Sequence, residues 1–496
     1  MASNLTQLIL EVAQARPELR IRDVDADETI TLRELVGCAA GWAMQAKRSG
    51  LRAGARVALV QENSLRLLIE WAGCQFAGLE TALVNPAFPA DLLQQLLAVL
   101  SPVAVSSTAN LGEWTSAPQL GAVVGVDVAA LREQSRRARG YFLEPLPGSR
   151  RRSTATAGYM LTSGSEGIPK FCAQSHNYFL QLGQLFARQL LLTPHDRVFT
   201  PLPLFHINPL GYALLGGICA GADVIFAQRF SASNFWQQVS AEEVTALVLH
   251  TGPVQILKSR DPHEQEPHRV RIAFLADHEF LERFGIDVGV AAYGSTEAGG
   301  ISHIRTWQRR EAPAPETTPG RYVAGVPRPD LECRVAENGE ILLRELTPGS
   351  LFSGYLSPHG GLDRCRDGDG WFHTGDLGED GADGRLAFLG RAKEALRIRG
   401  EFVPIAYLEQ RFSSLLEGTP VAVWYPSGDD PKIALYVEGQ LDESALARIR
   451  GAATQLPRFM RPDLVALVES LPRDSGVGKV LHRHLSTMQA ESWVPL

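Results

Sequence analysis

Apolar and polar positions along the first four-fifths of the chain predict strands and helices in alternation. Residues 55–63, ARVALVQEN, are strand-like, and residues 64–78, SLRLLIEWAGCQFAG, carry apolar residues at helical spacing. Residues 81–86, TALVNP, are strand-like again. A strand, a helix and a second strand in this order form the βαβ unit that builds parallel sheets.

The same alternation returns further along the chain. Residues 178–192 have apolar side chains at helical spacing, and residues 222–227 and 245–250 are strand-like. We therefore expect an α/β fold, with residues 1–389 forming a large N-terminal domain in which several sheets are flanked by helices.

The pattern changes after about residue 388. The remaining segment has short strand-like runs of its own, beginning at Val421 and Ile433, together with helical stretches. About a hundred residues are enough for a small α+β domain. We expect the charged stretch GRAKEALRIRG, residues 390–400, to be the joint, and residues 401–496 to be the small C-terminal domain.

Composition narrows the class of protein. Hydrophobic residues make up 45% and charged residues 21% of the 496 residues, as in globular proteins, and the net charge of −7 gives no support to a nucleic-acid binder. The six cysteines lie far apart without a CxxC pair, which fits neither a disulfide framework nor a zinc site. We expect reduced thiols and a cytoplasmic location.

No apolar run approaches the ~20 residues that span a bilayer. The apolar run near the N-terminus is short and interrupted by Glu11, which argues against a secretory signal. We therefore expect no membrane span.

The segment TSGSEGIPK, residues 162–170, has the composition of a phosphate-binding loop. Gly164 and Gly167 let the backbone approach an anion, and Lys170 adds a cation. Hydroxyl donors come from Thr162, Ser163 and Ser165. The spacing is not the GxxxxGK[ST] of a P-loop, so a P-loop NTPase is disfavoured. On its own, the segment is also compatible with an ordinary Gly/Ser turn between strand and helix.

Five further motifs follow in a particular order: PLPLFHINPLG (201–211), AAYGSTEAGG (291–300), DGWFHTGDLG (369–378), GRAKEALRIRGE (390–401) and PRDSGVGKVLHR (472–483). The series resembles the motif set of the adenylate-forming superfamily, which comprises acyl-CoA and aryl-CoA synthetases, adenylation domains of nonribosomal peptide synthetases, and luciferase. PLFHI and the segment RFSASNFWQQVSAEEVTALVLHTGP are most similar to acyl-CoA synthetases of the crotonobetaine/carnitine ligase type.

The resemblance implies a two-step reaction that uses ATP and Mg²⁺. A carboxylate attacks the α-phosphorus of ATP, pyrophosphate leaves, and the acyl-adenylate is then captured by a nucleophile, with CoA as the expected co-substrate. Two alternatives stay open for the acceptor, namely the phosphopantetheine of a carrier protein or an amine that gives an amide. A third alternative is an inactive homologue that only binds nucleotide.

By the same resemblance, YGSTE supplies much of the nucleotide site. Glu297 is expected to bind Mg²⁺, Thr296 to hydrogen-bond the α-phosphate, and Tyr293 to lie against the adenine. Gly294 and Ser295 belong to the same nucleotide-binding motif.

The resemblance places the remaining nucleotide contacts later in the chain. Asp376 is expected to accept hydrogen bonds from the ribose hydroxyls, and Arg391 to reach the nucleotide. Lys479 of the small domain is expected to bridge the acyl carboxylate and the α-phosphate. Rotation of the small domain about Lys393 would then withdraw this lysine, with Gly400 beside the passage for the pantetheine arm of CoA.

The acyl pocket is expected from family position alone, with His206 as an aromatic gate or, as the alternative, a polar contact to the substrate. The residues expected to line it are His206, Asn208, Tyr212, His250, Thr251, Gly252 and Ala292.

Several positions depart from the family pattern. Glu166 replaces a usual threonine and Phe171 a usual glycine, and the loop between Pro472 and Lys479 is one residue longer than usual. We expect Glu166 to point away from the phosphates or to meet the metal ion. The Gly-rich segment that relatives place against adenine is shortened here, so that residues 275–277 must serve or the contact is lost.

Overall fold

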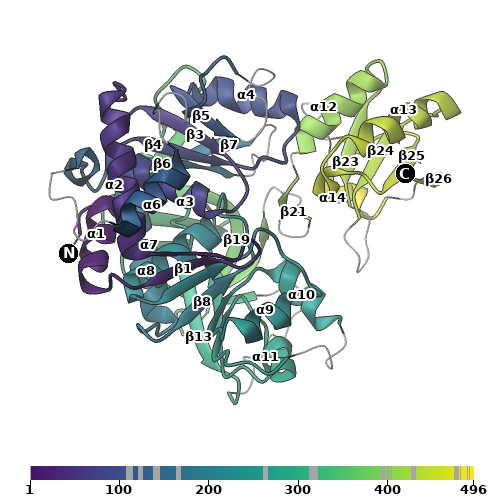
Figure 1. The fold of residues 1–496 in the computed structure, drawn as a ribbon. Helices are drawn as coiled ribbons and strands as arrows, with labels where there is room; N and C mark the ends of the chain where they lie inside the picture. The colour runs from purple at the N-terminus through teal and green to yellow at the C-terminus, as the bar shows by residue number, and fades with distance from the viewer. Residues whose placement is uncertain are drawn as a thin grey trace. The chain divides into compact units, whose positions relative to one another are not determined.

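A computed structural model describes most of the chain (Figure 1). The residues it describes are 2–107, 115–120, 124, 127–137, 146–162, 169–260, 266–311, 322–381, 383–391, 397–398, 401–403, 405–425, 432–473, 480, 482–488, 490 and 492–496.

The chain divides into two compact units. The large unit comprises Met1–Pro86, Leu97–Leu161 and Phe171–Gly390, and the small unit comprises Ala87–Leu96, Thr162–Lys170 and Arg391–Leu496. Sheets and helices occur in both units, as expected for the α/β class. The domain bounds expected from the sequence stay predictions.

Most of the helices before residue 390 cover the sheets of the large unit (Figure 1), whereas residues 90–96 of one of them, α4, belong to the small unit. They are α1 (Leu5–Ala15), α2 (Leu32–Arg48), α3 (Leu65–Ala77), α4 (Ala90–Leu100), α6 (Val128–Arg137), the short 3₁₀ helix η2 (Pro147–Arg150), α7 (His176–Gln189), the π-helix η3 (Asn208–Leu214), α8 (Leu215–Ala220), α9 (Phe235–Ala241), α10 (Thr251–Lys258) and α11 (His278–Phe284).

A seven-stranded sheet contains the predicted βαβ unit. Its strands run in the order β18 (Leu362–Asp363), β17 (Gly354–Leu356), β7 (Lys170–Ser175), β6 (Thr156–Thr162), β4 (Glu80–Val84), β3 (Arg56–Val60) and β5 (Ala104–Ser107). β3 pairs with β4 in parallel, and α3 connects them, so this prediction is confirmed. Ser64 caps the first turn of α3 by accepting from Leu67 N, and Gly78 ends the helix with φ +75°.

A second, thirteen-stranded sheet positions the site. Its order is β15 (Leu331–Val335), β16 (Glu340–Glu345), β19 (Phe372–Asp380), β20 (Leu386–Arg391), β14 (Tyr322–Pro327), β13 (His303–Gln308), β12 (Val288–Tyr293), β11 (Ile272–Phe274), β10 (Ala246–Val248), β8 (Arg197–Thr200), β9 (Asp223–Phe226), β1 (Arg20–Asp23) and β2 (Glu28–Thr31). The run from β12 through β11, β10, β8 and β9 to β1 is parallel throughout. The predicted strands at residues 222–227 and 245–250 are β9 and β10.

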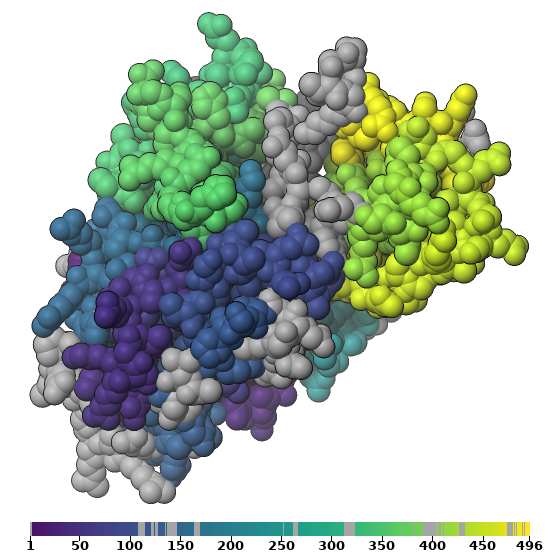
Figure 2. Space-filling view, turned by 90° about the horizontal axis from the view of Figure 1, so that it is seen from above, coloured from purple at the N-terminus to yellow at the C-terminus, as the bar shows by residue number. Residues whose placement is uncertain are grey.

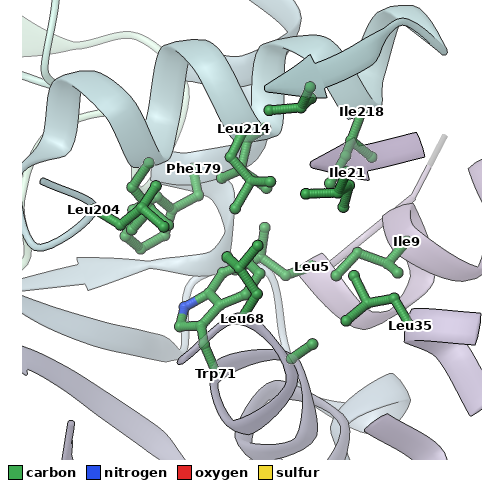
Figure 3. Packing of buried hydrophobic residues seen from close by; sticks show 14 of the residues in the cluster. Leu5, Ile9, Ile21, Leu35, Leu68, Trp71, Phe179, Leu204, Leu214 and Ile218 are labelled. Carbon is green, nitrogen blue, oxygen red and sulfur yellow. The ribbon is translucent and has the colours of Figure 1, made fainter. Parts of the chain in front are cut away.

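The main core of the large unit lies among α1, α2, α3, α7 and α8. Figure 3 shows Leu5 of α1 toward Leu68 and Trp71 of α3, Ile9 of α1 toward Leu35 of α2, and Phe179 of α7 toward Leu204. Apolar side chains at helical spacing in residues 178–192 become the buried face of α7, as the sequence predicts.

The small unit has its own sheet, in the order β23 (Val421–Trp424), β24 (Ala434–Glu438), β25 (Leu464–Val468) and β26 (Ser492–Pro495). Its other elements are the pair β21 (Arg397–Ile398) and β22 (Glu401–Phe402), with α12 (Ile405–Leu415), α13 (Glu443–Thr454), the 3₁₀ helix η5 (Arg458–Met460) and α14 (His482–Leu485). Residues from about 405 onward, light green to yellow in Figure 2, gather in one contiguous body. Both strands expected from Val421 and Ile433 are present.

Within the described residues, none of the helices combines the length and apolar character needed to cross a bilayer.

Candidate active site

Loops from four neighbouring strands meet at one edge of the thirteen-stranded sheet. β8, β10, β11 and β12 are parallel neighbours, so their carboxyl ends lie along the same edge. His206 follows β8, His250 follows β10, Leu275 follows β11, and residues 294–301 follow β12. Ligands of open α/β sheets bind at this edge. The fold therefore brings four segments that carry residues expected at the site to one edge of the sheet.

The loop of residues 294–301, called here the 294–301 loop, is tightly folded. A Cβ at Gly294 would lie 2.1 Å from the carbonyl oxygen of Gly300, so only glycine fits there. Gly299 and Gly300 both have φ +76°, in the left-handed region that glycine adopts most readily. The carbonyl of Ser295 accepts from the amides of Ala298 (3.1 Å) and Gly300 (2.9 Å). This folding fixes where Thr296 and Glu297 sit.

Distant residues anchor the main chain of the same loop. The buried hydroxyl of Tyr178 in α7 donates to Thr296 O (2.9 Å), and the amide of Phe352 donates to Glu297 O (3.2 Å). Buried carbonyls need such partners, since an unmade hydrogen bond is costly away from water. The loop is thus held in one conformation without the regular hydrogen bonds of a β-sheet.

Glu297 is oriented by a tyrosine of the other sheet. The hydroxyl of Tyr355 in β17 donates to Glu297 Oε1 at 2.9 Å. Burial, and next the nearby charge of Glu297, raise the pKa of Tyr355, so the phenol stays protonated and can act as the donor. Glu297 itself is largely buried.

Tyr293 and Asp376 meet although 83 positions separate them. Tyr293 Oη donates to Asp376 Oδ2 at 2.7 Å, and the Tyr293 ring stacks on Phe388 with centroids 5.3 Å apart. The amide of Asp376 donates to Thr374 Oγ1 at 3.1 Å, which fixes the HTGD turn. A carboxylate accepts several hydrogen bonds, so Asp376 keeps acceptor capacity for ribose hydroxyls while it is bonded to Tyr293.

Of the residues predicted for the acyl pocket, Tyr212 lies beside the 294–301 loop and Asn208 contacts the segment before α10. Tyr212 is buried, and its ring stacks on Phe186 at 5.1 Å. A Cβ at Gly300 would lie 3.2 Å from Tyr212 Oη, so this tyrosine adjoins the loop. Asn208 Nδ2 donates to Leu249 O (2.9 Å), which ties η3 to the residues that precede α10.

The other pocket positions lie on the same elements. His206 is half-buried and packs edge-on against Phe205 at 4.8 Å. His250 is the N-cap residue of α10, which begins at Thr251, and Gly252 is half-buried in its first turn. Ala292 lies in β12 opposite Ile304. The side chain of Thr251 is outside the described residues.

A Mg²⁺ site built from several protein ligands is not present in the part of the chain that the structure describes, where no three His, Cys, Asp or Glu residues cluster to hold a metal. Mg²⁺ is usually bound through one or two carboxylates together with substrate phosphates and waters. Glu297, a single oriented carboxylate beside Thr296, fits such a nucleotide-bound ion.

Many predicted residues belong to the small unit or fall outside the described chain. Thr162 ends β6 and Lys170 begins β7, while Arg391 ends β20 with its side chain outside the described set. The residues outside the described ranges are Ser163, Gly164, Ser165, Glu166, Gly167, Lys393, Gly400 and Lys479.

Leu275 and Asp277, two of the residues expected near the adenine, make hydrogen bonds within the large unit. Leu275 has φ +57°, which is rare for leucine, and its amide donates to Val290 O (2.8 Å). Asp277 caps α11 by accepting from Phe280 N (2.8 Å) and pairs with Lys258 Nζ (2.8 Å). Asp277 therefore stabilises the N-terminal end of α11.

The sequence did not reveal Tyr178, Tyr355 or Arg328, the last of which is also bonded to the 294–301 loop. Each contacts the loop from a distant part of the chain. A tyrosine in a helix or strand is typically a core aromatic, and an arginine between two prolines is typically exposed. No local pattern distinguished them.

Comparisons with known proteins identify the family of the chain. The AMP-binding enzyme family matches residues 10–356. Sulfoacetate-CoA ligase of Cupriavidus necator is 31% identical over 345 residues, which cover 66% of this chain and 66% of that protein, just under two thirds. A medium/long-chain-fatty-acid-CoA ligase of Mycobacterium tuberculosis is 27% identical over 479 residues, covering 90% of this chain and 79% of that one. Crotonobetaine/carnitine-CoA ligase of Escherichia coli is 27% identical over 347 residues, with 66% of each covered.

Solved structures share the fold over nearly the whole chain. A double mutant of o-succinylbenzoate CoA synthetase from Bacillus subtilis, bound to a product analogue, gives a TM-score of 0.79 at 22% identity, covering 98% of this chain and 99% of that one. A fatty acyl CoA synthetase of Mycobacterium tuberculosis gives 0.65 at 20% identity, with 98% and 99% covered. The expected fold class and the expected superfamily are both confirmed. Since the family match covers more than half of its length, the chain belongs to the AMP-binding enzyme family.

Proposed function

We propose that the chain is an AMP-forming acid-CoA ligase, which activates a carboxylic acid with ATP and Mg²⁺ and passes the acyl group to CoA. The observation that carries the proposal is the hydrogen bond from Tyr293 to Asp376, 2.7 Å long. It joins the two residues expected at the base and the ribose of one nucleotide. Thr296 and Glu297, expected at the phosphate and the metal, follow Tyr293 in the same loop.

The relatives support CoA as the acceptor. The three named above are all CoA ligases, for sulfoacetate, for medium and long-chain fatty acids, and for crotonobetaine or carnitine. We therefore favour CoA over a carrier protein or an amine. Their acids differ widely in charge and length, so the acid used here depends on the pocket of this chain around Asn208, Tyr212 and His250.

In the first step, an oxygen of the substrate carboxylate forms a bond to the α-phosphorus while the bond to pyrophosphate breaks. The protein supplies position and electrostatic stabilisation. The Thr296 hydroxyl would donate to an α-phosphate oxygen, Glu297 would hold Mg²⁺, and the ammonium of Lys479 would bridge the two reacting groups. Mg²⁺ offsets negative charge on the phosphate oxygens.

In the second step, the sulfur of CoA attacks the acyl carbon, AMP leaves as the oxygen anion, and the thiol proton passes to solvent. The second step does not use Lys479, whose ammonium would otherwise stay in contact with the phosphate of AMP. We propose that the small unit moves about Lys393 to withdraw it, with Gly400 lining the passage for pantetheine. Lysine suits a contact that must form and then be withdrawn better than arginine does, because its ammonium is a point charge on a flexible stem.

The test is pyrophosphate release from MgATP across aliphatic, aryl, amino and sulfonated carboxylic acids, each with CoA, with an amine, and with neither. We expect one class of acid to give release that CoA accelerates and that yields a thioester. Acceleration by the amine alone would instead establish amide formation. Tight ATP binding without release for every acid would contradict the ligase.

Two lysine variants test whether Lys479 takes part in the first step. Lys479→Ala should lower the rate of pyrophosphate release at least a hundredfold, ~2.7 kcal/mol of barrier, while leaving ATP affinity within a few-fold. Lys47→Ala is the matched control and should leave the rate unchanged, because this lysine is exposed in the last turn of α2 and is none of the predicted site residues. Equal rates for Lys479→Ala and the unsubstituted chain would overturn the scheme.

A further inference from the structure

Arg328 and Asp330, directly after β14, form an ion pair inside the large unit. The Arg328 side chain is 0% exposed and that of Asp330 is 12% exposed. Arg328 Nε donates to Asp330 Oδ1 at 2.9 Å, and Nη2 donates to Oδ2. Removing two charges from water is expensive, and an apolar pair of similar volume would often be at least as stable. Stability alone therefore does not account for this pair.

The remaining corner of the guanidinium is directed at the 294–301 loop. Arg328 Nη1 donates to Gly299 O at 2.7 Å and to Ile301 O at 2.9 Å. The amide of Arg328 donates to Ser302 O at 2.9 Å. One residue thus binds two carbonyls in the second half of the loop that carries Thr296 and Glu297, and a third carbonyl, that of Ser302, directly after the loop.

The second half of the loop, residues 299–301, is where the main chain most needs such contacts. Gly299 and Gly300 have φ +76°, which breaks any regular ladder. A Cβ at Gly299 would lie 3.0 Å from Arg328 Nη1, so the guanidinium packs directly against the main chain. Glycine also gains more freedom than other residues when it is released. Without Arg328, this half of the loop would have access to other conformations.

The planar guanidinium suits both tasks at once. Its Nε and Nη2 edge pairs bidentately with Asp330, which fixes the plane and aims Nη1 at the carbonyls. Lysine has a single nitrogen at the end of a flexible chain and cannot maintain both sets of bonds.

We propose that Arg328 is a positioning residue of the active site, which holds the 294–301 loop so that Thr296 and Glu297 meet the nucleotide and its metal ion, while Asp330 orients the guanidinium. The proposal rests on the proposed function for the roles of Thr296 and Glu297. Its structural part, that Arg328 holds the loop, stands without that function.

Three variants of the full-length chain test this: Arg328→Lys, Asp330→Asn, and the double variant Arg328→Met/Asp330→Leu. The double variant removes both charges, so it should remain folded even where a single change leaves a buried charge unpaired. Arg344→Lys is the matched control, because Arg344 pairs with Glu332 on the neighbouring strands, with both side chains 40% exposed.

Two measurements are made on each folded variant at a temperature well below its unfolding midpoint. The first is hydrogen exchange of the Ala298 and Gly300 amides without nucleotide, since both donate to Ser295 O within the loop. The second is the dissociation constant of MgATP, measured by calorimetry. We expect exchange to become at least tenfold faster and MgATP affinity at least tenfold weaker in Arg328→Lys and the double variant. The control should change by less than twofold in both.

The outcomes separate the two proposals. Unchanged exchange and unchanged MgATP affinity in the folded double variant would overturn the positioning role and leave Arg328 as a structural ion pair. Faster exchange in a chain whose unsubstituted form binds no ATP would sustain the anchoring of the loop and reject the proposed function.

Discussion

At the scale of single residues, the site depends on side chains whose partners fix their orientation. Tyr293 is held by Asp376 and by the ring of Phe388, and Glu297 is held by Tyr355. Preorganised groups cost little further ordering when a ligand arrives, so loss of an orienting bond should appear first in ligand affinity.

The bond from Tyr355 to Glu297 is open to a direct test. Tyr355→Phe removes one hydroxyl and keeps the ring, so we expect the Mg²⁺ and ATP concentrations needed for half-maximal pyrophosphate release to rise about tenfold, since hydrogen bonds to charged groups contribute ~1.5–3 kcal/mol. The matched control is Tyr159→Phe, because Tyr159 donates to the carboxylate of Glu80 at 2.7 Å elsewhere in the same sheet. An equal effect of the two variants would contradict the orienting role.

Leu275 tests backbone strain at the carboxyl end of β11. Its φ of +57° favours glycine, and a Cβ in this region costs ~1–2 kcal/mol. We expect Leu275→Gly to be more stable than Leu275→Ala by about 1 kcal/mol, the reverse of the usual order of these residues. Chemical denaturation of both variants measures the difference. Equal stability, or a more stable alanine variant, would show that the strain is relieved elsewhere.

At the scale of elements, close packing sets what each helix tolerates. α2 and α3 approach closely because Gly73 has no side chain. A Cβ there would lie 2.7 Å from Trp42 Cδ2, and Trp42 is buried. Interiors as dense as this do not absorb an added methyl group without displacement of neighbours.

Two glycine substitutions in helices should therefore have opposite signs. Alanine favours a helix over glycine by ~1 kcal/mol, but overpacking costs ~1–3 kcal/mol. We expect Gly73→Ala in α3 to destabilise the large unit and Gly451→Ala in α13, where an added Cβ meets nothing within 4 Å, to stabilise the small unit. Protection of the amides of each helix against hydrogen exchange reports the two effects separately. Stabilisation by both substitutions would show that Trp42 shifts freely.

Elements could be predicted where their pattern is local. Residues 64–78 gave α3 because the apolar spacing, the Ser64 cap and the Gly78 stop are all in one short stretch. The place of β1 beside β9 could not be predicted, since Ile21 pairs with Val224 through a contact between distant segments.

The residues of the site also differ in how far the sequence alone could predict them. Its motif residues were visible, whereas Tyr178 and Arg328 act through carbonyls far away in the sequence.

At the scale of the whole molecule, buried neutral histidines link stability to pH. Burial lowers the pKa of His303 to about 4 and, as the larger cause beside the charge of Arg151, that of His176 to about 4. Both lie in the large unit. The pKa of an unfolded histidine is ~6.5, so the unfolded chain takes up these protons first as the pH falls.

The sign of the effect follows from this order. Between pH ~6.5 and ~4 the unfolded state binds more protons than the folded state, so the free energy of unfolding falls as the pH falls, by up to about 1.4 kcal/mol per pH unit for each histidine. Above pH ~6.5 the contribution is fully present. Below the folded pKa of about 4 it no longer changes.

His303→Asn should therefore flatten the acid limb of the stability curve. Asparagine keeps a polar atom for Ser302 Oγ, which lies 3.1 Å from His303 Nδ1, and takes up no proton. Urea denaturation at pH 7.5, 6.0 and 5.0 measures the free energy of unfolding, and the difference between variant and unsubstituted chain cancels the carboxylates that titrate in the same range. His195→Asn, at an exposed position, is the control and should leave the slope unchanged. Parallel curves for His303→Asn and the unsubstituted chain would contradict the lowered pKa of His303, because they would mean that His303 gains a proton in the folded protein as readily as in the unfolded one.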